Sequence, residues 1–168
     1  MRVLRCGLTI LLAAVAMAAL GVGGAAADTA DTAAEKPEIY VKPGGVFSEG
    51  WTYALNGYDP VSYFTETGPR PGSDLFTFQW KGALWRFASR DNMDKFVQRP
   101  QRFAPQYGGY CAWAMAHDRM AAGDPQVWAI HNGKLYLNLN RAIKGKWDKN
   151  RDALIARADA NWPGILSE

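Results

Sequence analysis

One cysteine, one methionine and one histidine stand close together in the sequence and could bind a soft metal ion. Cys111 and Met115 are four residues apart, so a helix would place their side chains on one face. A thiolate and a thioether form a ligand pair suited to Cu(I). His117 could join them only if the helix ends before it, which the nearby Asp118 and Gly123 allow. These three residues are the candidate metal ligands, with copper as the first metal to consider.

The same cysteine admits two other interpretations. Free cysteine and methionine often pack inside a core, so Cys111 and Met115 could simply be buried. A thiol enzyme or redox sensor is the second alternative, because Gly108–Gly109 could let backbone amides approach a ligand and a helix that begins at Tyr110 could lower the pKa of the thiol. Such an enzyme also needs a base within reach of the sulfur, and nothing in the sequence places a histidine there. The sequence therefore favours a binding module over an enzyme.

Aromatic residues near the cysteine form a further candidate site. Tyr107, Tyr110 and Trp113 follow one another closely, and Tyr58 and Tyr63 lie upstream. Such rings could line a concave site for a sugar or a small apolar molecule, or they could fill the core of a small domain. We expect Trp113 in the core, whereas the sequence leaves both alternatives open for Tyr107 and Tyr110.

Two segments have the alternating pattern of β-hairpins. In the first, 75–80 and 83–88, a two-residue turn would pair Phe76 with Phe87 and Phe78 with Trp85. In the second, 126–131 and 134–138, Asn132–Gly133 is a strong hairpin signal. The second register pairs Trp128 with Leu137, Ile130 with Leu135, and a solvent-exposed His131 with Lys134.

Helices are expected between and after these hairpins. Ser89 can cap a helix that Pro100 stops, a short helix is expected over Tyr110–His117, and another over Arg151–Trp162. Strands and helices mix without a βαβ rhythm, which indicates an α+β fold. We therefore expect a small single domain in which two antiparallel β-hairpins pack against several short helices.

The N-terminus has the pattern of a secretory signal peptide. A cationic start is followed by an apolar run and by Ala25–Ala26–Ala27, so residues 1–27 would be removed by cleavage after Ala27. We expect the mature protein in the periplasm or secreted, with no membrane span. It would comprise an extended arm (28–52), the domain (53–163) and a short tail (164–168).

Charge and cysteine content bear on two points, nucleic-acid binding and disulfide bonds within the chain. Cleavage removes two arginines from a chain with 19 basic and 16 acidic residues, so the mature protein is nearly neutral. No basic block is present, and a nucleic-acid partner is therefore not expected. Cys6 would leave with the signal peptide, so Cys111 would be the single thiol and no disulfide could form within the chain.

Several separated motifs resemble the YHS domain family, and in particular its exported bacterial branch. The resemblance covers about 53–163, and the residues that carry it are Asp59–Pro60–Val61, Phe87, Ser89, Phe96, Pro100, Tyr107–Ala112, Gly123–Asp124–Pro125, Leu135–Asn138 and Ala158–Pro163.

The resemblance implies a fold but not the family's metal site. Metal-associated YHS domains carry cysteines at the positions that Ser62, Ala88 and Asn92 occupy in this chain. Alanine has no donor atom, and serine and asparagine are poor ligands for soft metals. The sequence therefore predicts an exported YHS-like binding or accessory module whose ligand is a metal ion, copper first, or a small molecule. A Cys111-based enzyme or redox sensor and a metal-free interaction module of the cell envelope are the alternatives.

Overall fold

A computed structural model describes the protein over residues 36–42, 53–65 and 68–167. The chain divides after Thr32 into two units, and only the second contains described residues. The predicted signal peptide and its cleavage site therefore lie outside the described part of the chain. Within that part, no helix is both long enough and apolar enough to span a membrane.

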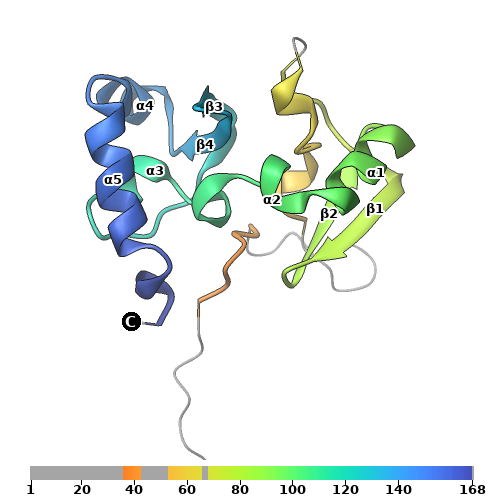
Figure 1. The fold of residues 1–168 in the computed structure, drawn as a ribbon, viewed down its shortest axis with the longest axis horizontal. Helices are drawn as coiled ribbons and strands as arrows, with labels where there is room; N and C mark the ends of the chain where they lie inside the picture. The colour runs from red at the N-terminus through yellow and green to blue at the C-terminus, as the bar shows by residue number, and fades with distance from the viewer. Residues whose placement is uncertain (1–35, 43–52, 66–67, 168) are drawn as a thin grey trace, which may run out of the picture. The chain divides into compact units, whose positions relative to one another are not determined.

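The first hairpin consists of β1 (Ser73–Trp80) and β2 (Ala83–Phe87), which pair antiparallel (Figure 1). Phe78 pairs with Trp85, as the alternating pattern predicts. The predicted pairing of Phe76 with Phe87 is wrong, because an irregularity in β1 places Phe87 opposite Ser73 instead. A bulge of this kind shifts the register on one side of it and leaves the other side in place.

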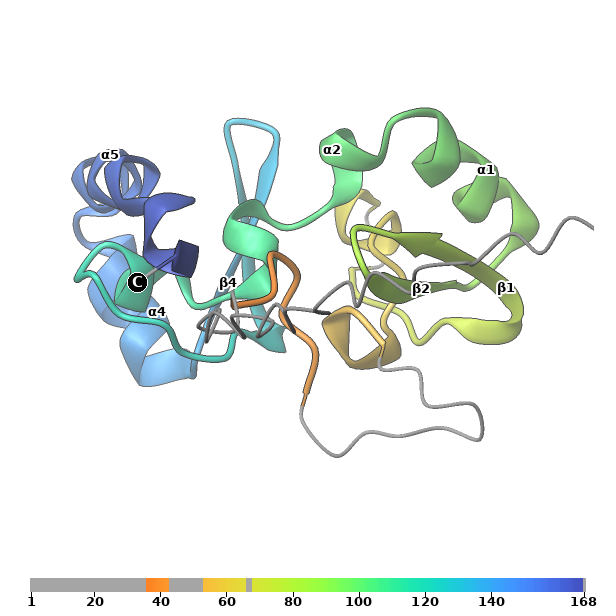
Figure 2. The same cartoon turned by 90° about the horizontal axis from the view of Figure 1, so that it is seen from below.

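Helix α1 (Arg90–Gln98) packs against this hairpin and closes the first core (Figure 2). The Ser89 side chain caps it as predicted and accepts a hydrogen bond from the Asn92 backbone N–H at 3.2 Å. Phe96 is fully buried, with its ring centroid 4.9 Å from that of Trp85 and 5.2 Å from that of Phe87. After α1, Pro100 occupies the first turn of the short helix α2 (Pro100–Phe103).

The second hairpin consists of β3 (Asp124–His131) and β4 (Lys134–Asn138), and all three predicted pairs occur. Successive side chains of a strand point to opposite faces. Leu135 and Leu137 accordingly belong to the first core, whereas Tyr136 belongs to the second. β4 is thus buried on both faces and separates the two cores.

The second core lies among three helices that follow or precede this hairpin. α3 (Ala112–Met115) contacts α5 (Arg151–Asn161) and α4 (Arg141–Asp148). α3 is shorter than the predicted helix, because Tyr110 and Cys111 are extended and form bridges with other segments. α4 was not foreseen from the sequence, where an interior Gly145 weakens the helical signal.

Both ends of the described chain contribute to the domain. Ile39 is buried, and the backbone N–H of Tyr40 donates to the carbonyl of Gly108 at 2.9 Å. At the other end, Gly164–Ser167 forms a 3-10 helix that buries Ile165 and Leu166. Further 3-10 helices cover Leu55–Gly57, Ser62–Phe64 and Gln106–Gly109.

The domain therefore includes residues that the sequence assigned to an arm and a tail. The α+β prediction, a small single domain with two antiparallel hairpins packed against short helices, is confirmed.

Candidate functional site

A cavity of about 600 Å³ lies where the end of α3 meets the last turns of α5. Cavities in this size range hold small ligands in many proteins. Polar and apolar surface contribute about equally to its wall, and two segments far apart in the sequence supply the lining residues. The lining residues are Trp113, Ala116, His117, Asp118, Arg119, Arg157, Ala160 and Asn161.

His117 is partly buried in this wall, and its orientation is fixed from two sides. Its ring stacks on Trp113 with a centroid separation of 4.0 Å, and its Nδ1 lies 2.7 Å from the Trp113 carbonyl oxygen. Because a carbonyl oxygen only accepts, Nδ1 carries the proton, and Nε2 of the neutral ring is left as an acceptor. Nε2 has no hydrogen-bond partner among the described residues and is available to a ligand in the cavity.

Arginines give the cavity a positive balance of charge. Arg119 and Arg157 both line it, and neither guanidinium is paired with a carboxylate of the described chain. The Lys146 ammonium lies 5.9 Å from the centroid of the Trp113 ring. Asp118 is the one carboxylate among the lining residues that the structure describes. Two unpaired guanidinium groups in one concave site attract oxyanions, which they can bind in a bidentate manner.

Asn161 joins the two elements that form the cavity. Its Nδ2 donates to the Met115 carbonyl at 2.8 Å, which ties the end of α5 to the end of α3. The same carbonyl also accepts from the Asp118 backbone N–H at 3.1 Å, so Asn161 adds a second donor from another element. Asn161 thereby ties together the two elements that bring His117 and Arg157 to one cavity.

Cys111 lies away from this cavity, in a polar contact beneath β4. It is 1% exposed and pairs with Leu137 through an isolated parallel bridge. The backbone N–H of Leu139 donates to Sγ at 3.3 Å, and the thiol contacts Asn138 Oδ1 at 3.8 Å. Asn138 is itself fully buried, and its Nδ2 has no partner among the described residues. Neither histidine is among the hydrogen-bond partners of the sulfur.

The three predicted metal ligands occupy three different surroundings. Cys111 contacts Asn138 and Leu139, whereas Met115 is fully buried in the second core among Tyr107, Tyr110 and other residues. His117 alone lines the α3–α5 cavity. In the described ranges, no three His, Cys, Asp or Glu side chains are grouped so that they could share a metal ion. That grouping does not count methionine, so the copper site predicted at Cys111, Met115 and His117 stays a prediction.

The burial of Cys111 leads to a chemical prediction. In the native protein we expect iodoacetamide to alkylate this thiol on the order of 100-fold more slowly than in guanidinium chloride, because reaction requires local opening. Intact-mass measurement over time checks the rate. Free glutathione, alkylated in parallel with and without denaturant, controls for the effect of guanidinium on the reagent. A native rate equal to the denatured rate would show that the thiol is accessible and would revive the enzyme alternative.

Three residues of the YHS-like motifs, Ser62, Ala88 and Asn92, form hydrogen bonds with one buried residue, Asp59. Asp59 is 0% exposed, and its Oδ2 accepts from the Ala88 backbone N–H at 2.9 Å and from Asn92 Nδ2 at 2.6 Å. Ser62 Oγ donates to the Asp59 carbonyl at 2.7 Å. Oδ1 accepts from the Val61 backbone N–H at 2.8 Å. These residues do not fit a soft metal; they form a hydrogen-bonded centre in which the carboxylate is the acceptor.

His131 is less exposed than the sequence suggested. Its Nε2 contacts Asp152 Oδ1 at 2.6 Å, and its Nδ1 lies 3.3 Å from Arg151 Nη1. Arginine only donates, so Nδ1 accepts and the Nε2–H donates to Asp152. The prediction of a solvated histidine is corrected in part: the side chain is 21% exposed, and Arg151 and Asp152 of the first turn of α5 contact both of its ring nitrogens.

The aromatic residues are divided between core and cavity walls. Tyr107 and Tyr110 are buried at 4% and 6% exposure, and burial raises the pKa of both phenols. Trp113, expected in the core, is partly exposed and forms a wall of the α3–α5 cavity. Arg119, Arg157 and Asn161 were not singled out from the sequence, because no local spacing connects residues on separate elements.

The resemblance to YHS domains rests on the sequence motifs alone, because comparisons with known proteins add no match. Family models, curated proteins and solved structures were each searched, and none matches this chain.

Proposed function

We propose that this protein is an exported, YHS-like binding module that holds a small oxyanion, a carboxylate or a phosphate, in the α3–α5 cavity. One observation carries the proposal: two unpaired guanidinium groups and an imidazole with a fixed tautomer line the same cavity. The module is not proposed to be an enzyme, since its single mature thiol is buried away from both histidines.

The chemistry of binding follows from the donors in the wall. Arg119 and Arg157 supply planar pairs of N–H donors that match carboxylate and phosphate oxygens. His117 Nε2 accepts a hydrogen bond from a protonated ligand oxygen or, once protonated, adds a third positive charge. Trp113 supplies an apolar face beside these groups, and this face suits the carbon skeleton of an organic anion.

Two sequence features support the remainder of the proposal. The cationic start, the apolar run and the small residues before Asp28 support export. The grouping of Ser62, Ala88 and Asn92 around Asp59 supports the likeness to YHS domains, because residues at family-equivalent positions lie at one place.

Isothermal titration of the purified protein with phosphate and with succinate tests the anion site. We expect at least one probe to bind, and Arg157→Ala to weaken that binding by about tenfold or more, since a hydrogen bond to a charged group contributes about 1.5–3 kcal/mol. Arg90→Ala is the matched control: it removes the same charge from an exposed site on α1. Equal losses in the two variants, or no binding of either probe, contradict the proposal.

Metal binding remains the second candidate, and one observation favours it. A histidine whose Nδ1–H is held by a carbonyl presents Nε2 as metal-binding histidines do, and His117 has this arrangement. Titration with Cu(I) under reducing conditions, with His117→Ala and Cys111→Ser in parallel, separates the two ideas. Tight binding that only His117→Ala abolishes supports a metal at the cavity, whereas loss in Cys111→Ser supports the ligand set predicted from the sequence.

A further inference from the structure

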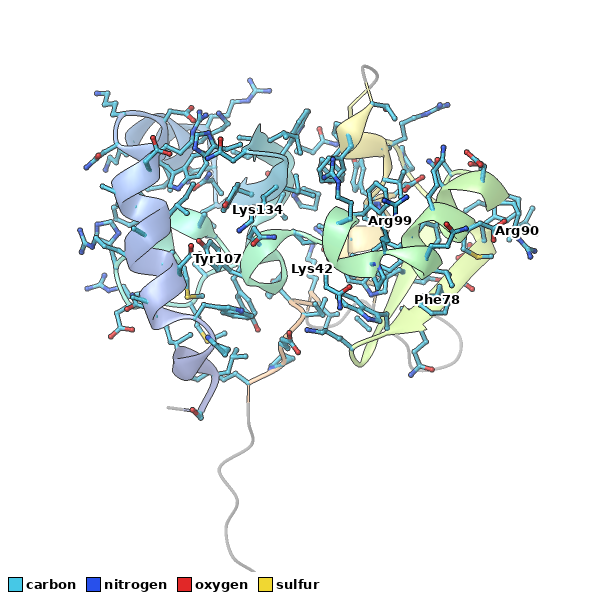
Figure 3. The ribbon with its side chains drawn as sticks, viewed as in Figure 1. Lys42, Phe78, Arg90, Arg99, Tyr107 and Lys134 are labelled. Carbon is cyan, nitrogen blue, oxygen red and sulfur yellow. The ribbon has the colours of Figure 1, made fainter. Side chains whose placement is uncertain are left out.

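A second cavity, of about 370 Å³, lies on a different part of the domain and shares no lining residue with the first. The N-terminal segment, the β1–β2 turn, α2, the loop that follows it, β4 and α5 all contribute to its wall. Figure 3 labels Tyr107 and Lys134, two of its lining residues. Because six segments contribute to this cavity, its shape depends on the tertiary fold and not on a single loop.

The loop that contains Tyr107 and Gly108 has a backbone conformation that is unfavourable for residues with a side chain. Tyr107 has φ 54° and ψ 35°, in the left-handed region that bulky residues rarely adopt. Gly108 follows with φ 60°, and a Cβ on it would lie 1.7 Å from the Glu38 carbonyl oxygen. Strain of this kind concentrates at ligand sites, where the surrounding structure holds it. The loop contacts the N-terminal segment through Gly108 and α5 through Tyr107, which also lines the cavity.

Two of the four charged side chains that line this wall form an ion pair with each other. The Tyr107 hydroxyl donates to Asp159 Oδ1 at 2.7 Å, and burial together with this bond raises the pKa of the phenol, so the proton stays on it. Lys81 forms an ion pair with Glu38. Lys134 is exposed and makes no ion pair with any carboxylate of the described chain. The phenol is neutral, so it does not cancel the charge of Asp159. Among the described residues, the wall therefore has two charges without an ion-pair partner: the Asp159 carboxylate beside Tyr107 and the Lys134 ammonium at the exposed side.

The remaining groups suit hydroxyl-rich ligands. Gln101 and Gln106 each offer an amide that both donates and accepts. Trp80 and Trp162 add broad apolar faces, against which the C–H faces of a sugar ring can pack. The aromatic rings can pack against the apolar faces of a sugar, and the amides and carboxylates can form hydrogen bonds with its hydroxyl groups. An inorganic oxyanion fits less well, because two carboxylates share the wall with the single free ammonium.

We infer that this second cavity binds an acidic saccharide, with its sugar ring among Trp80, Tyr107 and Trp162 and its carboxylate at Lys134. A neighbouring cavity of about 540 Å³ shares Glu38 and Trp162 with this one. Trp162 thus stands between two concave sites, and a second sugar unit occupies the neighbour. The site differs from the oxyanion cavity in ligand and in residues, so neither proposal depends on the other.

The test follows the tryptophan indole N–H signals of the purified protein by two-dimensional NMR during titration with glucuronate and with glucose. We expect both sugars to shift one or more indole signals, with glucuronate binding about tenfold more tightly because of its charge-assisted contact with Lys134. Lys134→Ala removes this preference and leaves glucose binding in place. Lys95→Ala is the matched control, since Lys95 is exposed on α1 and pairs with Asp91.

Three results would overturn or restrict the inference. If neither sugar shifts an indole signal at tens of millimolar, the cavity does not bind saccharides. If Lys134→Ala and Lys95→Ala reduce glucuronate binding equally, the effect is one of net charge and the carboxylate is not at Lys134. A disaccharide that ends in glucuronate should bind more tightly than glucuronate alone, and equal affinity contradicts a second unit beside Trp162. All substituted lysines are exposed, so the variants are expected to fold.

Discussion

Asp59→Ala is expected to lower the free energy of unfolding by about 3–5 kcal/mol, enough to unfold a marginally stable domain. The carboxylate is fully buried and accepts from the Val61 and Ala88 backbone N–H groups and from Asn92 Nδ2. Alanine would leave the buried Val61 N–H and the part-buried Ala88 and Asn92 donors without this acceptor, and each would lose part of the solvation it has in the unfolded chain. These bonds also connect the 59–62 turn to the end of β2 and to α1, so their loss releases three segments at once.

Guanidinium unfolding followed by tryptophan fluorescence measures this effect. Asp59→Asn should cost less than Asp59→Ala, because its one carbonyl oxygen can still accept from Ala88 and Asn92 while Val61 loses its acceptor. Asp94→Ala is the control: Asp94 is exposed and pairs with Arg90 four residues away, so its loss should change stability by less than about 0.5 kcal/mol. If the guanidinium midpoint of Asp59→Ala equals that of Asp94→Ala, the hydrogen bonds to Asp59 do not stabilise the fold.

Gly108→Ala is expected to have the second-largest effect, a loss of about 2–4 kcal/mol in the free energy of unfolding. The left-handed backbone at φ 60° costs an alanine about 1–2 kcal/mol by itself. The new Cβ would also lie 1.7 Å from the Glu38 carbonyl oxygen, so the N-terminal segment must move away. That movement breaks the hydrogen bond from the Tyr40 N–H to the Gly108 carbonyl.

Gly133→Ala separates the two costs. Gly133 has a similar φ of 71°, but an added Cβ there would meet nothing within 4 Å. Its expected cost is therefore the backbone term alone, about 1–2 kcal/mol. Hydrogen exchange at Tyr40 should accelerate in Gly108→Ala and stay unchanged in Gly133→Ala. Equal stability of the two variants, with equal exchange at Tyr40, would mean that the contact with Glu38 is not a constraint.

Local sequence patterns determined the secondary structure where the partners are neighbours in the chain. Asn132–Gly133 fixed the second hairpin, and the pairing of Trp128 with Leu137 followed from counting outward from that turn. Ser89 capped α1 as expected. The first hairpin was predictable only as far as its bulge, since a bulge depends on how the strand packs. α4 was not predicted because Gly145 interrupts its helical pattern. In the structure, contacts with β3 and β4 stabilise this helix.

The candidate sites were decided by packing between distant segments. The helical spacing of Cys111 and Met115 suggested a metal pair, yet the bridge to Leu137 extends Cys111 and directs it toward β4. His117 was found from its residue type, but no spacing predicted that Arg119 and Arg157 would join it.

By itself, then, the sequence determined the α+β class, the second hairpin and the cap of α1, because hydrogen bonds and turns act over a few residues. Only the tertiary structure decided which side chains share a cavity, because the contacts between α3 and α5, and between the N-terminal segment and Gly108, join residues that lie far apart along the chain. Contacts between distant segments also bury Asp59, which bonds to Ala88 and Asn92, and Cys111, which lies against Leu137 and Leu139.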